Sequence, residues 1–383
     1  MPDFAALSDS PVLAKLHPWR WITFAAILLT FPLFLSDPWL QMLVFVGIFV
    51  VLGLGLNIVV GFAGLLDLGY VAFFAAGAYT MGILAAPGSP HEIGLSFWLV
   101  LPLGMLIAAS FGLLLGLPVL PLRGDYLAIV TLGFGEIIRL FLVNREDLTK
   151  GSQGLSGIPR PEIGDFTIRA FDHWFYFILA TALLVGFVAS RLRESRIGRA
   201  WEAIREDEDV AAAMGVNTVK YKLLAFATGA AIGGFGGVFY ASFIGFISPA
   251  SFSLQVSIDV IAIVIIGGMG STPGVIVGSL ILIGLPRILQ FQETADFLGN
   301  FEWLRSAFNG VLAGMDAIVP FTIGRFPPAS EWGASLADDT RFIIFGAALV
   351  AIMVLRPSGL FPSRRRTLEF QDESAPARGE GAA

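Results

Sequence analysis

Long apolar runs alternate with polar connections along most of this chain, and their lengths predict membrane-crossing helices. A helix needs about 20 apolar residues to cross roughly 30 Å of hydrocarbon. The pattern therefore predicts an all-α, polytopic membrane protein with about ten transmembrane helices. The predicted spans lie at residues 20–36, 39–62, 66–86, 95–120, 125–143, 173–190, 221–246, 256–268, 273–291 and 340–355.

Two glycine-rich segments interrupt these runs. GFAGLLDLG occupies residues 61–69, and GGMGSTPG at residues 267–274 splits one long apolar stretch, where the chain either forms two spans or makes a re-entrant turn. Discontinuous segments in the two halves of a chain frame the binding site of many transporters. A duplicated architecture is a hypothesis here, because no internal repeat can be aligned by eye.

The composition agrees with a membrane protein. Of the 383 residues, 56% are hydrophobic and 14% are charged, an apolar share well above that of a soluble domain. Cysteine is absent, which excludes disulfides, thiolate nucleophiles and cysteine-ligated metals. The first 18 residues are polar, and no small-residue cleavage pattern follows the first span, so we expect that span to be uncleaved.

Lysine and arginine are concentrated in three places, which predicts the orientation of the spans. They gather near the N-terminus, in the loop at 191–222 and in the segment 356–366. Positively charged loops stay on the cytoplasmic side. Six predicted spans separate the first two clusters, and four separate the last two. Because an even number of crossings returns the chain to the same side of the membrane, all three clusters can lie on the cytoplasmic side. We therefore expect cytoplasmic termini and long external loops at 144–172 and 292–339.

The predicted organisation has three parts. A cytoplasmic arm at 1–18 precedes a single transmembrane domain at 19–362, and a disordered cytoplasmic tail follows at 363–383. The transmembrane domain contains a cytoplasmic loop at 191–220. Its external loop at 292–339 carries apolar residues with helical spacing, which is typical of an interfacial amphipathic helix.

Few charged residues lie within the predicted spans, so each is a candidate for a functional role. A carboxylate near the bilayer centre costs about 2.5–3.5 kcal/mol on insertion scales. Asp67 either accepts backbone N–H bonds at a helix entry or lies beside a substrate path, whereas Asp259 is nearer a span end, which favours a structural role. Glu136 and Arg139 are three residues apart and are expected to form a structural ion pair on one helix face.

Glycines recur every four residues in two places. This spacing predicts a helix face where a neighbouring backbone can approach closely. Tight packing is the simpler interpretation, and a hinge or gate is the alternative. The two sets are Gly229, Gly233, Gly237 and Gly270, Gly274, Gly278.

A charged segment, GRAWEAIREDEDVAAAMG at residues 198–215, stands between two long apolar runs. Ile197, Trp201, Ile204 and Ala211 fall near one face, which predicts a compact amphipathic helix at the cytoplasmic surface. It could lie on lipid headgroups, form a solvated linker or dock a cytosolic partner. Its run of acidic residues argues against an anionic lipid surface. A groove in a partner protein is the better match.

Motifs for catalysis are absent from the sequence. No HExxH or GxSxG pattern occurs, and none of the four lysines lies in a GxxxxGK[ST] loop that would bind ATP. Ionisable residues do not line several spans, as a proton or ion relay would require. We expect a transporter subunit without enzymatic activity or a cofactor of its own, and energy for uphill transport would come from another protein.

Several sequence blocks resemble one family in order along the chain. The chain is similar to the LivM-type permease subunit of branched-chain amino acid ABC importers, and the similarity covers about residues 39–361. The resemblance implies that the charged segment at 198–215 is the cytoplasmic loop that couples such a permease to its ATPase. The segment departs from the strict EAAxxxG pattern of that loop in the residues before Gly215. The blocks are GFAGLLDLGYVAFFAAGAY at 61–79, GDYLAIVTLGFGEIIRL at 124–140, GLSGIPRP at 154–161, RIGRAWEAIREDEDVAAAMGVN at 196–217, IGGMGSTPGVIVG at 266–278 and LRPSGLF at 355–361.

The resemblance implies a heteromeric importer in a bacterial inner (plasma) membrane. Its partners would be a LivH-like second permease subunit, two cytosolic ATPase subunits that bind ATP and Mg, and a periplasmic amino acid binding protein that could contact the external loop. Membrane lipid would surround the subunit, and no nucleic acid partner is expected. Other cargo, such as urea, short amides or other amino acids, is an alternative, and so is a stand-alone secondary transporter driven by an ion gradient.

The resemblance and the residue pattern together nominate two groups of site residues. The candidate contacts to the ATPase are Arg199, Trp201, Glu202, Ala203, Arg205, Glu206, Asp207, Ala212 and Gly215. The candidates along the translocation path are Gly64, Asp67, Gly69, Tyr70, Phe73, Glu136 and Arg139.

Overall fold

The computed structural model describes residues 35–288 apart from residues 92, 121, 123 and 165, together with Thr30 and Pro32. Several predictions fall outside the described residues. These are the N-terminal arm and the charge cluster near it, the span at 20–36 almost entirely, the external loop at 292–339, the span at 340–355, and the C-terminal charge cluster and tail.

Five helices of the described part are long and apolar enough to cross a membrane. They match five of the predicted spans to within a few residues, and they confirm an all-helical, polytopic membrane protein. The five are α3 (Asp37–Leu56), which continues into the π-helical turn η2 (Asn57–Phe62), α5 (Phe97–Val119), α6 (Asp125–Asn144), α8 (Phe171–Glu194) and α11 (Thr218–Ile244).

Three further predicted spans form shorter helices. α4 (Val71–Ala85) is preceded by a loop, and α12 (Leu254–Gly267) has 14 residues, which at 1.5 Å per residue is about 21 Å. The chain then reverses at residues 268–271 and returns as α13 (Thr272–Ser279), the π-helical turn η5 (Leu280–Gly284) and α14 (Leu285–Ile288). The glycine-rich segment is therefore a turn between two short apolar helices that pack against each other.

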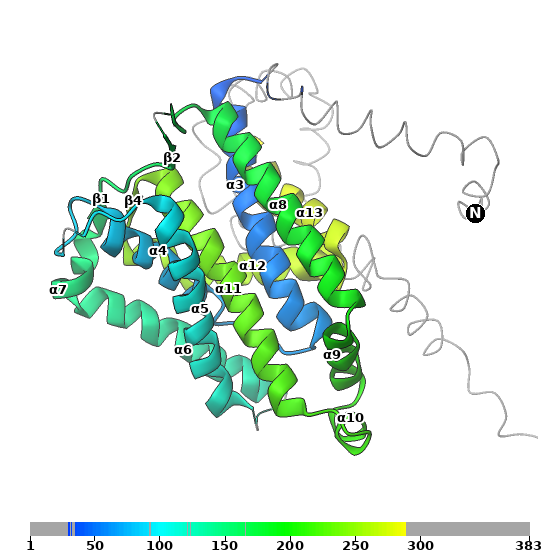
Figure 1. The fold of residues 1–383 in the computed structure, drawn as a ribbon. Helices are drawn as coiled ribbons and strands as arrows, with labels where there is room; N and C mark the ends of the chain where they lie inside the picture. Colours follow the sequence, from blue (N-terminus) through cyan, green and yellow to red (C-terminus); the bar gives the residue numbers. More distant parts are fainter. Residues whose placement is uncertain are drawn as a thin grey trace, which may run out of the picture.

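The remaining elements cap the two ends of the helical bundle (Figure 1). At one end, residues 145–170 form short elements, and at the other end α9 (Arg196–Glu206) and α10 (Glu208–Ala213) join α8 to α11. The short elements are α7 (Glu146–Thr149), η3 (Gly151–Gln153), β1 (Leu155–Ser156), β2 (Glu162–Ile163) and β3 (Phe166–Thr167), joined at the same end by β4 (Phe246–Ile247) and η4 (Pro249–Phe252).

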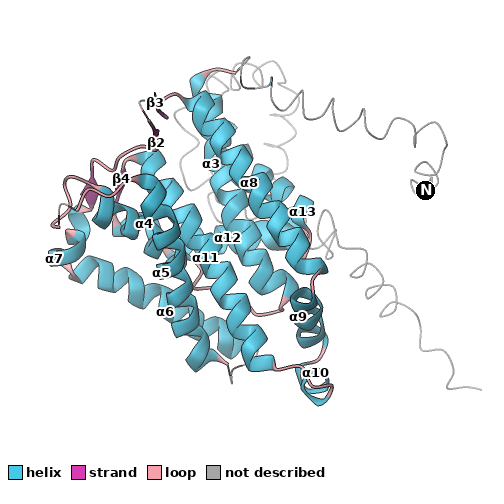
Figure 2. Cartoon of the chain, viewed as in Figure 1, coloured by secondary structure: helices cyan, strands magenta, loops and turns pink. Residues whose placement is uncertain are grey.

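The strands are minor features of an otherwise helical protein (Figure 2). β1 pairs antiparallel with β4, so that Leu155 lies opposite Ile247, and β2 pairs antiparallel with β3. The first pairing ties the loop that follows α6 to the end of α11. It therefore fixes the end of the bundle that lies opposite α9 and α10.

Helix α11 is the centre of the bundle, and its glycines let η2 and α4 approach closely. A Cβ on Gly229 would meet Val59 of η2, one on Gly233 would meet Phe73 of α4, and one on Gly237 would overlap the α4 backbone. These contacts are what the packing interpretation expects, because small residues permit close backbone contact. A hinge role stays a prediction.

The second glycine set does not lie on one helix face as predicted. Gly270 belongs to the turn, with a φ of 82° that favours glycine, and only Gly274 and Gly278 are helical. Both helical glycines face α12, where a Cβ on Gly274 would overlap the Gly267 carbonyl and one on Gly278 would meet the Ile263 carbonyl. These contacts hold the α12–α13 hairpin together.

Candidate functional site

The charged segment forms two helices rather than the single helix that its pattern predicts. α9 ends at Glu206, and α10 starts at Glu208. Between them Asp207 adopts an extended backbone, and its side chain accepts hydrogen bonds from the N–H groups of Asp209 and Val210. Aspartate is a favoured N-cap residue, so its own side chain explains why one helix ends and another begins there.

The apolar face of α9 and α10 is anchored to the rest of this chain. Trp201 is fully buried, and its indole N–H donates to the Tyr221 carbonyl at 2.7 Å. Ile204 and Ala211 are also buried, which confirms the amphipathic pattern. Trp201, predicted as a contact to another protein, instead packs inward against α11.

The opposite face of this segment is exposed. Among the candidate contacts, Arg199, Glu206, Asp207, Ala212 and Gly215 are exposed, and Glu202 and Ala203 are half-buried. Sequence reasoning missed Val210 and Met214, which are 58% and 81% exposed. Val210 lies on α10 and Met214 is the residue that caps its C-terminal end. Their spacing of four residues places two apolar side chains together on a charged surface, and that spacing was the signal available.

Gly215 ends α10 in a left-handed conformation, with a φ of 87°. The N–H of Gly215 donates to the Ala212 carbonyl, and the N–H of Val216 donates to the Ala211 carbonyl. A glycine at this position after a helix satisfies otherwise unpaired carbonyls without a Cβ penalty. We therefore expect a bulky residue at position 215 to distort the end of α10.

Two glycine-rich turns meet beneath α9. We call residues 57–64 the first turn and residues 268–271 the second turn. The N–H of Gly270 donates to the Asn57 side-chain oxygen at 2.8 Å, although the two residues are 213 positions apart. Asn57 is almost fully buried within η2. The two interruptions found in the sequence are therefore in direct contact, through an asparagine that the sequence did not single out.

Arginines from α8 and α9 reach both turns. Arg205 Nη1 donates to the Gly61 carbonyl at 2.7 Å, and the stem of Arg205 packs closely on Gly64. Arg193 Nη1 donates to the Gly270 carbonyl at 3.0 Å, and its Nε lies 3.8 Å from a Glu202 carboxylate oxygen. Arg205 was predicted to contact the ATPase, but its guanidinium points into the membrane domain.

A buried ion pair ties α10 to the start of α11. Lys222 Nζ lies 2.5 Å from Glu208 Oε1, and both side chains are largely covered. The same ammonium lies 3.4 Å from the Leu120 carbonyl at the end of α5. α10 is therefore fixed to two membrane helices, and α9 is fixed to the first turn through Arg205.

The first turn leads directly to Asp67, which is fully buried. Its Oδ1 accepts the N–H of Gly69 at 2.9 Å, the backbone bond expected of a helix-entry residue. Its Oδ2 has no hydrogen-bond partner among the described residues. A buried carboxylate oxygen without a partner is costly, so the described conformation carries a desolvation penalty at Asp67.

The residues after Asp67 are bonded to three different helices. The N–H of Leu68 donates to Thr131 Oγ1 of α6 at 3.0 Å, and the N–H of Val71 donates to Ser257 Oγ of α12 at 3.1 Å. The Tyr70 hydroxyl donates to the Gly229 carbonyl of α11 at 3.0 Å. A displacement of the first turn would therefore strain contacts with α6, α11 and α12 together.

The other path candidates occupy separate places. Gly69 packs on the Thr131 backbone, and Phe73 is fully buried. Glu136 and Arg139 form the expected pair, with Arg139 Nε 2.9 Å from Glu136 Oε1, but they lie on the outward side of α6. The structure thus groups Gly64, Asp67, Gly69, Tyr70 and Phe73 and leaves the ion pair apart from them.

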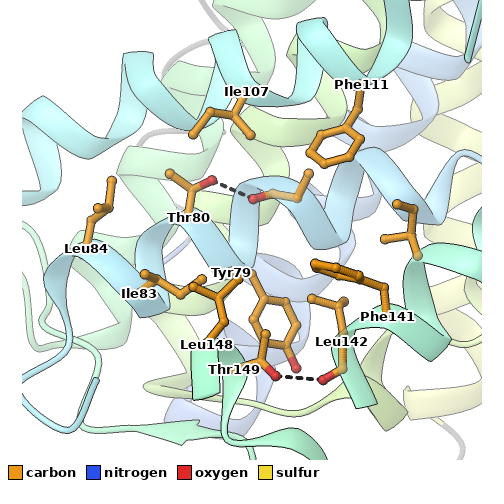
Figure 3. Close-up of a pocket in the computed structure, with 12 residues that line it drawn as sticks. Tyr79, Thr80, Ile83, Leu84, Ile107, Phe111, Phe141, Leu142, Leu148 and Thr149 are labelled. Carbon is orange, nitrogen blue, oxygen red and sulfur yellow. Dashed lines mark hydrogen bonds between the residues drawn. The ribbon is translucent and has the colours of Figure 1, made fainter. Parts of the chain in front are cut away.

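A cavity of about 240 Å³ lies between α4, α5, α6 and α7. Figure 3 shows Tyr79, Thr80 and Thr149 among otherwise apolar side chains such as Phe111 and Phe141. The threonine hydroxyls donate to backbone carbonyls, so they are occupied. No charged side chain lines the cavity. It therefore suits an apolar group better than the charged ammonium and carboxylate of a free amino acid.

A family described as the permease component of the branched-chain amino acid transport system matches residues 39–315. This match covers well over half of the chain. The chain belongs to this permease family. The resemblance found in the sequence is therefore confirmed, and the protein is a transport permease subunit of a branched-chain amino acid ABC system, not an enzyme.

Curated relatives agree with this assignment of the permease. The permease protein LivM of Salmonella typhimurium is 38% identical, over 88% of this chain and 72% of the relative. LivM of Escherichia coli is 35% identical over 98% of this chain and 81% of the relative. LivH of Salmonella typhimurium, a second permease protein, is 27% identical over 61% of this chain and 79% of the relative. No solved structure matches this chain significantly.

Proposed function

We propose that the permease carries branched-chain amino acids into the cytoplasm, driven by ATPase subunits that dock on α9 and α10. ATP and Mg would be bound by two cytosolic ATPase subunits, and a LivH-like permease and a periplasmic binding protein would complete the importer. The termini would then be cytoplasmic. The observation that carries this proposal is the hydrogen bond from Arg205 of α9 to the Gly61 carbonyl of the first turn.

The outward face of α9 and α10 has the chemistry of a protein docking surface. It combines the exposed acidic residues Glu206 and Asp209 with the exposed apolar pair Val210 and Met214. Acidic side chains disfavour an anionic lipid surface. An amphipathic helix that lays apolar anchors into a groove is a common mode of protein recognition, so an ATPase groove is the better occupant.

The inward contacts supply a route from the docking surface to the membrane domain. ATPase movement that shifts α9 would pull on Gly61 through Arg205. It would also act on Gly270 indirectly, because Glu202 of α9 pairs with Arg193 of α8, which donates to the Gly270 carbonyl. The first turn continues into Asp67, whose neighbours bond to α6, α11 and α12. Coupling requires that the ATPase and the cargo bias the same two-state element. We assign that role to the two turns together with α9.

The test replaces Arg205 with methionine in the complete reconstituted importer. Methionine keeps an apolar stem against Gly64 but removes the guanidinium. A hydrogen bond to a charged group contributes about 1.5–3 kcal/mol, so uptake per ATP hydrolysed should fall roughly tenfold or more. ATP hydrolysis itself should persist, because the docking face is unchanged. Arg196→Ala, at an exposed position of α9, is the matched control.

Two results would count against the proposal. A normal ratio of uptake to hydrolysis in Arg205→Met would show that the contact with Gly61 does not transmit movement. Uptake by the purified permease alone, under a proton or sodium gradient and without ATPase subunits, would favour the secondary transporter instead.

A further inference from the structure

The outward side of α6 carries charged groups in the middle of a membrane-crossing helix. Arg139 and Glu136 are 32% and 41% exposed at their side chains. α6 runs from Asp125 to Asn144, so Glu136 is eight residues from the nearer end, or about 12 Å at 1.5 Å per residue. Glu136 therefore lies deep within the apolar layer that the helix crosses, and Arg139 lies nearer the same end, at about 7.5 Å from it.

The pair neutralises its charge but does not use all of its hydrogen-bonding capacity. Arg139 Nε lies 2.9 Å and 3.1 Å from the two carboxylate oxygens of Glu136, and Arg139 Nη2 also bonds to Oε1. A guanidinium has five N–H donors. Among the described residues, Glu136 is its hydrogen-bond partner, so donors remain for a group on the outward side. Ionisable groups in membrane helices almost always face protein or water.

The surroundings of the pair fit a helix–helix contact. Gly133, one turn before Ile137, has open space where a Cβ would stand. Ile137 and Leu140 beside the pair are 63% and 47% exposed. A small residue flanked by apolar side chains and a polar group is the usual composition of a membrane helix interface.

Two other peripheral helices provide the contrast. The exposed side of α8 presents Leu183, Leu184 and Phe187 and no charged residue until Arg191 near its end. The exposed side of α5 presents Leu106 and Leu114, and α5 contains no charged residue. Both faces are compatible with lipid, whereas the α6 face is not.

We propose that the outward face of α6, around Gly133, Glu136 and Arg139, is the surface that the second permease subunit covers. This rests on the proposed function, which supplies that subunit. A permease of the second kind is itself similar to this chain over 251 residues. Related subunits commonly pair through the same patch on each partner, so a corresponding polar helix of the second permease would meet the free donors of Arg139.

The first test measures contact with lipid. The chain has no cysteine, so Leu140→Cys carries a single thiol for a fluorophore that brominated acyl chains quench. Leu184→Cys on α8 is the matched control. In the assembled importer, quenching at position 140 should be severalfold weaker than at position 184. Equal quenching at the two positions would overturn the proposal. Weak quenching at position 140 in vesicles that contain this permease alone would show that a second copy of this chain covers the outward face of α6. That result would also overturn the proposal.

The second test exchanges the pair, as Glu136→Arg with Arg139→Glu. The exchange keeps an internal ion pair but swaps the positions of the positive and negative side chains that face the partner. The amount of second permease that copurifies with this subunit should therefore fall severalfold, while membrane insertion stays equal. Unchanged recovery would overturn the proposal. Failure of the unmodified chain to recover any second permease would instead contradict the proposed function, which keeps the two outcomes separate.

Discussion

The two glycine-rich turns contact each other beneath α9, but they differ in the contacts that hold them in place. The first turn bonds to Arg205 at Gly61 and to Gly270 through Asn57, and it continues into a buried aspartate with an oxygen that has no partner among the described residues. The second turn is held by Arg193 and Asn57 and joins two helices whose glycines are in backbone contact. From this contrast we expect the first turn to be the movable one and the second to be rigid, so changes in each turn should have different consequences.

The largest effect is expected in the rigid part, from Gly274→Ala. The new Cβ would overlap the Gly267 carbonyl, and neither backbone can move without opening the α12–α13 hairpin. Overpacking typically costs about 1–3 kcal/mol, so the thermal stability and yield of the purified importer should fall. Gly186→Ala is the control, because its Cβ would make only ordinary contacts beyond 3.6 Å. Equal stability of the two variants would contradict a rigid second turn.

The second-largest effect is expected from Asn57→Ala, which removes the hydrogen bond between the two turns. The N–H of Gly270 would lose its acceptor inside the protein, and an unsatisfied buried donor costs about 1–3 kcal/mol. We expect lower thermal stability together with reduced uptake, because the movable turn loses its support. Asn144→Ala removes an exposed asparagine that bonds only to its own helix, and it should leave both quantities unchanged. Full uptake in Asn57→Ala would show that the turns act independently.

The sequence could predict much of this arrangement. Apolar run lengths located the long helices, and the spacing of Trp201, Ile204 and Ala211 predicted which side of the charged segment is buried. The glycine-rich interruptions were visible as well. These features depend on local periodicity, which a single sequence carries.

Other features depend on contacts between distant segments and could not be predicted. Asn57 is an ordinary polar residue in the sequence, and only the fold brings it to Gly270. The sequence grouped Arg205 with the other polar residues of the charged segment, but its long side chain reaches Gly61 beneath α9. The break at Asp207 was the exception, because an aspartate followed by helical residues is a local N-cap signal.

A smaller effect is expected from Gly64→Ala in the movable turn. Gly64 has a φ of 70°, and a left-handed conformation costs an alanine roughly 1–2 kcal/mol. Its Cβ would also press on the Cγ and Cβ atoms at the base of the Arg205 side chain, which should weaken the hydrogen bond from Arg205 to Gly61. Assembly should persist while uptake per ATP falls. Gly157→Ala has the same strain, with a φ of 74°, but open space around it. A matching loss of uptake in that control would assign the effect to strain alone.

The smallest effect on stability is expected from Asp67→Asn. This substitution removes the carboxylate charge but keeps the hydrogen bond to the backbone of Gly69. Asparagine keeps an oxygen for the N–H of Gly69, so the backbone should not change. It also replaces an unpartnered carboxylate oxygen with an amide, which costs less to bury than a charge. The described conformation should therefore be equally or more stable, while uptake slows because the permease leaves this conformation less readily. The measurements are thermal stability and initial uptake rate, with Asp67→Ala as the variant that loses both features. Normal uptake by Asp67→Asn would restrict Asp67 to its role at the helix entry.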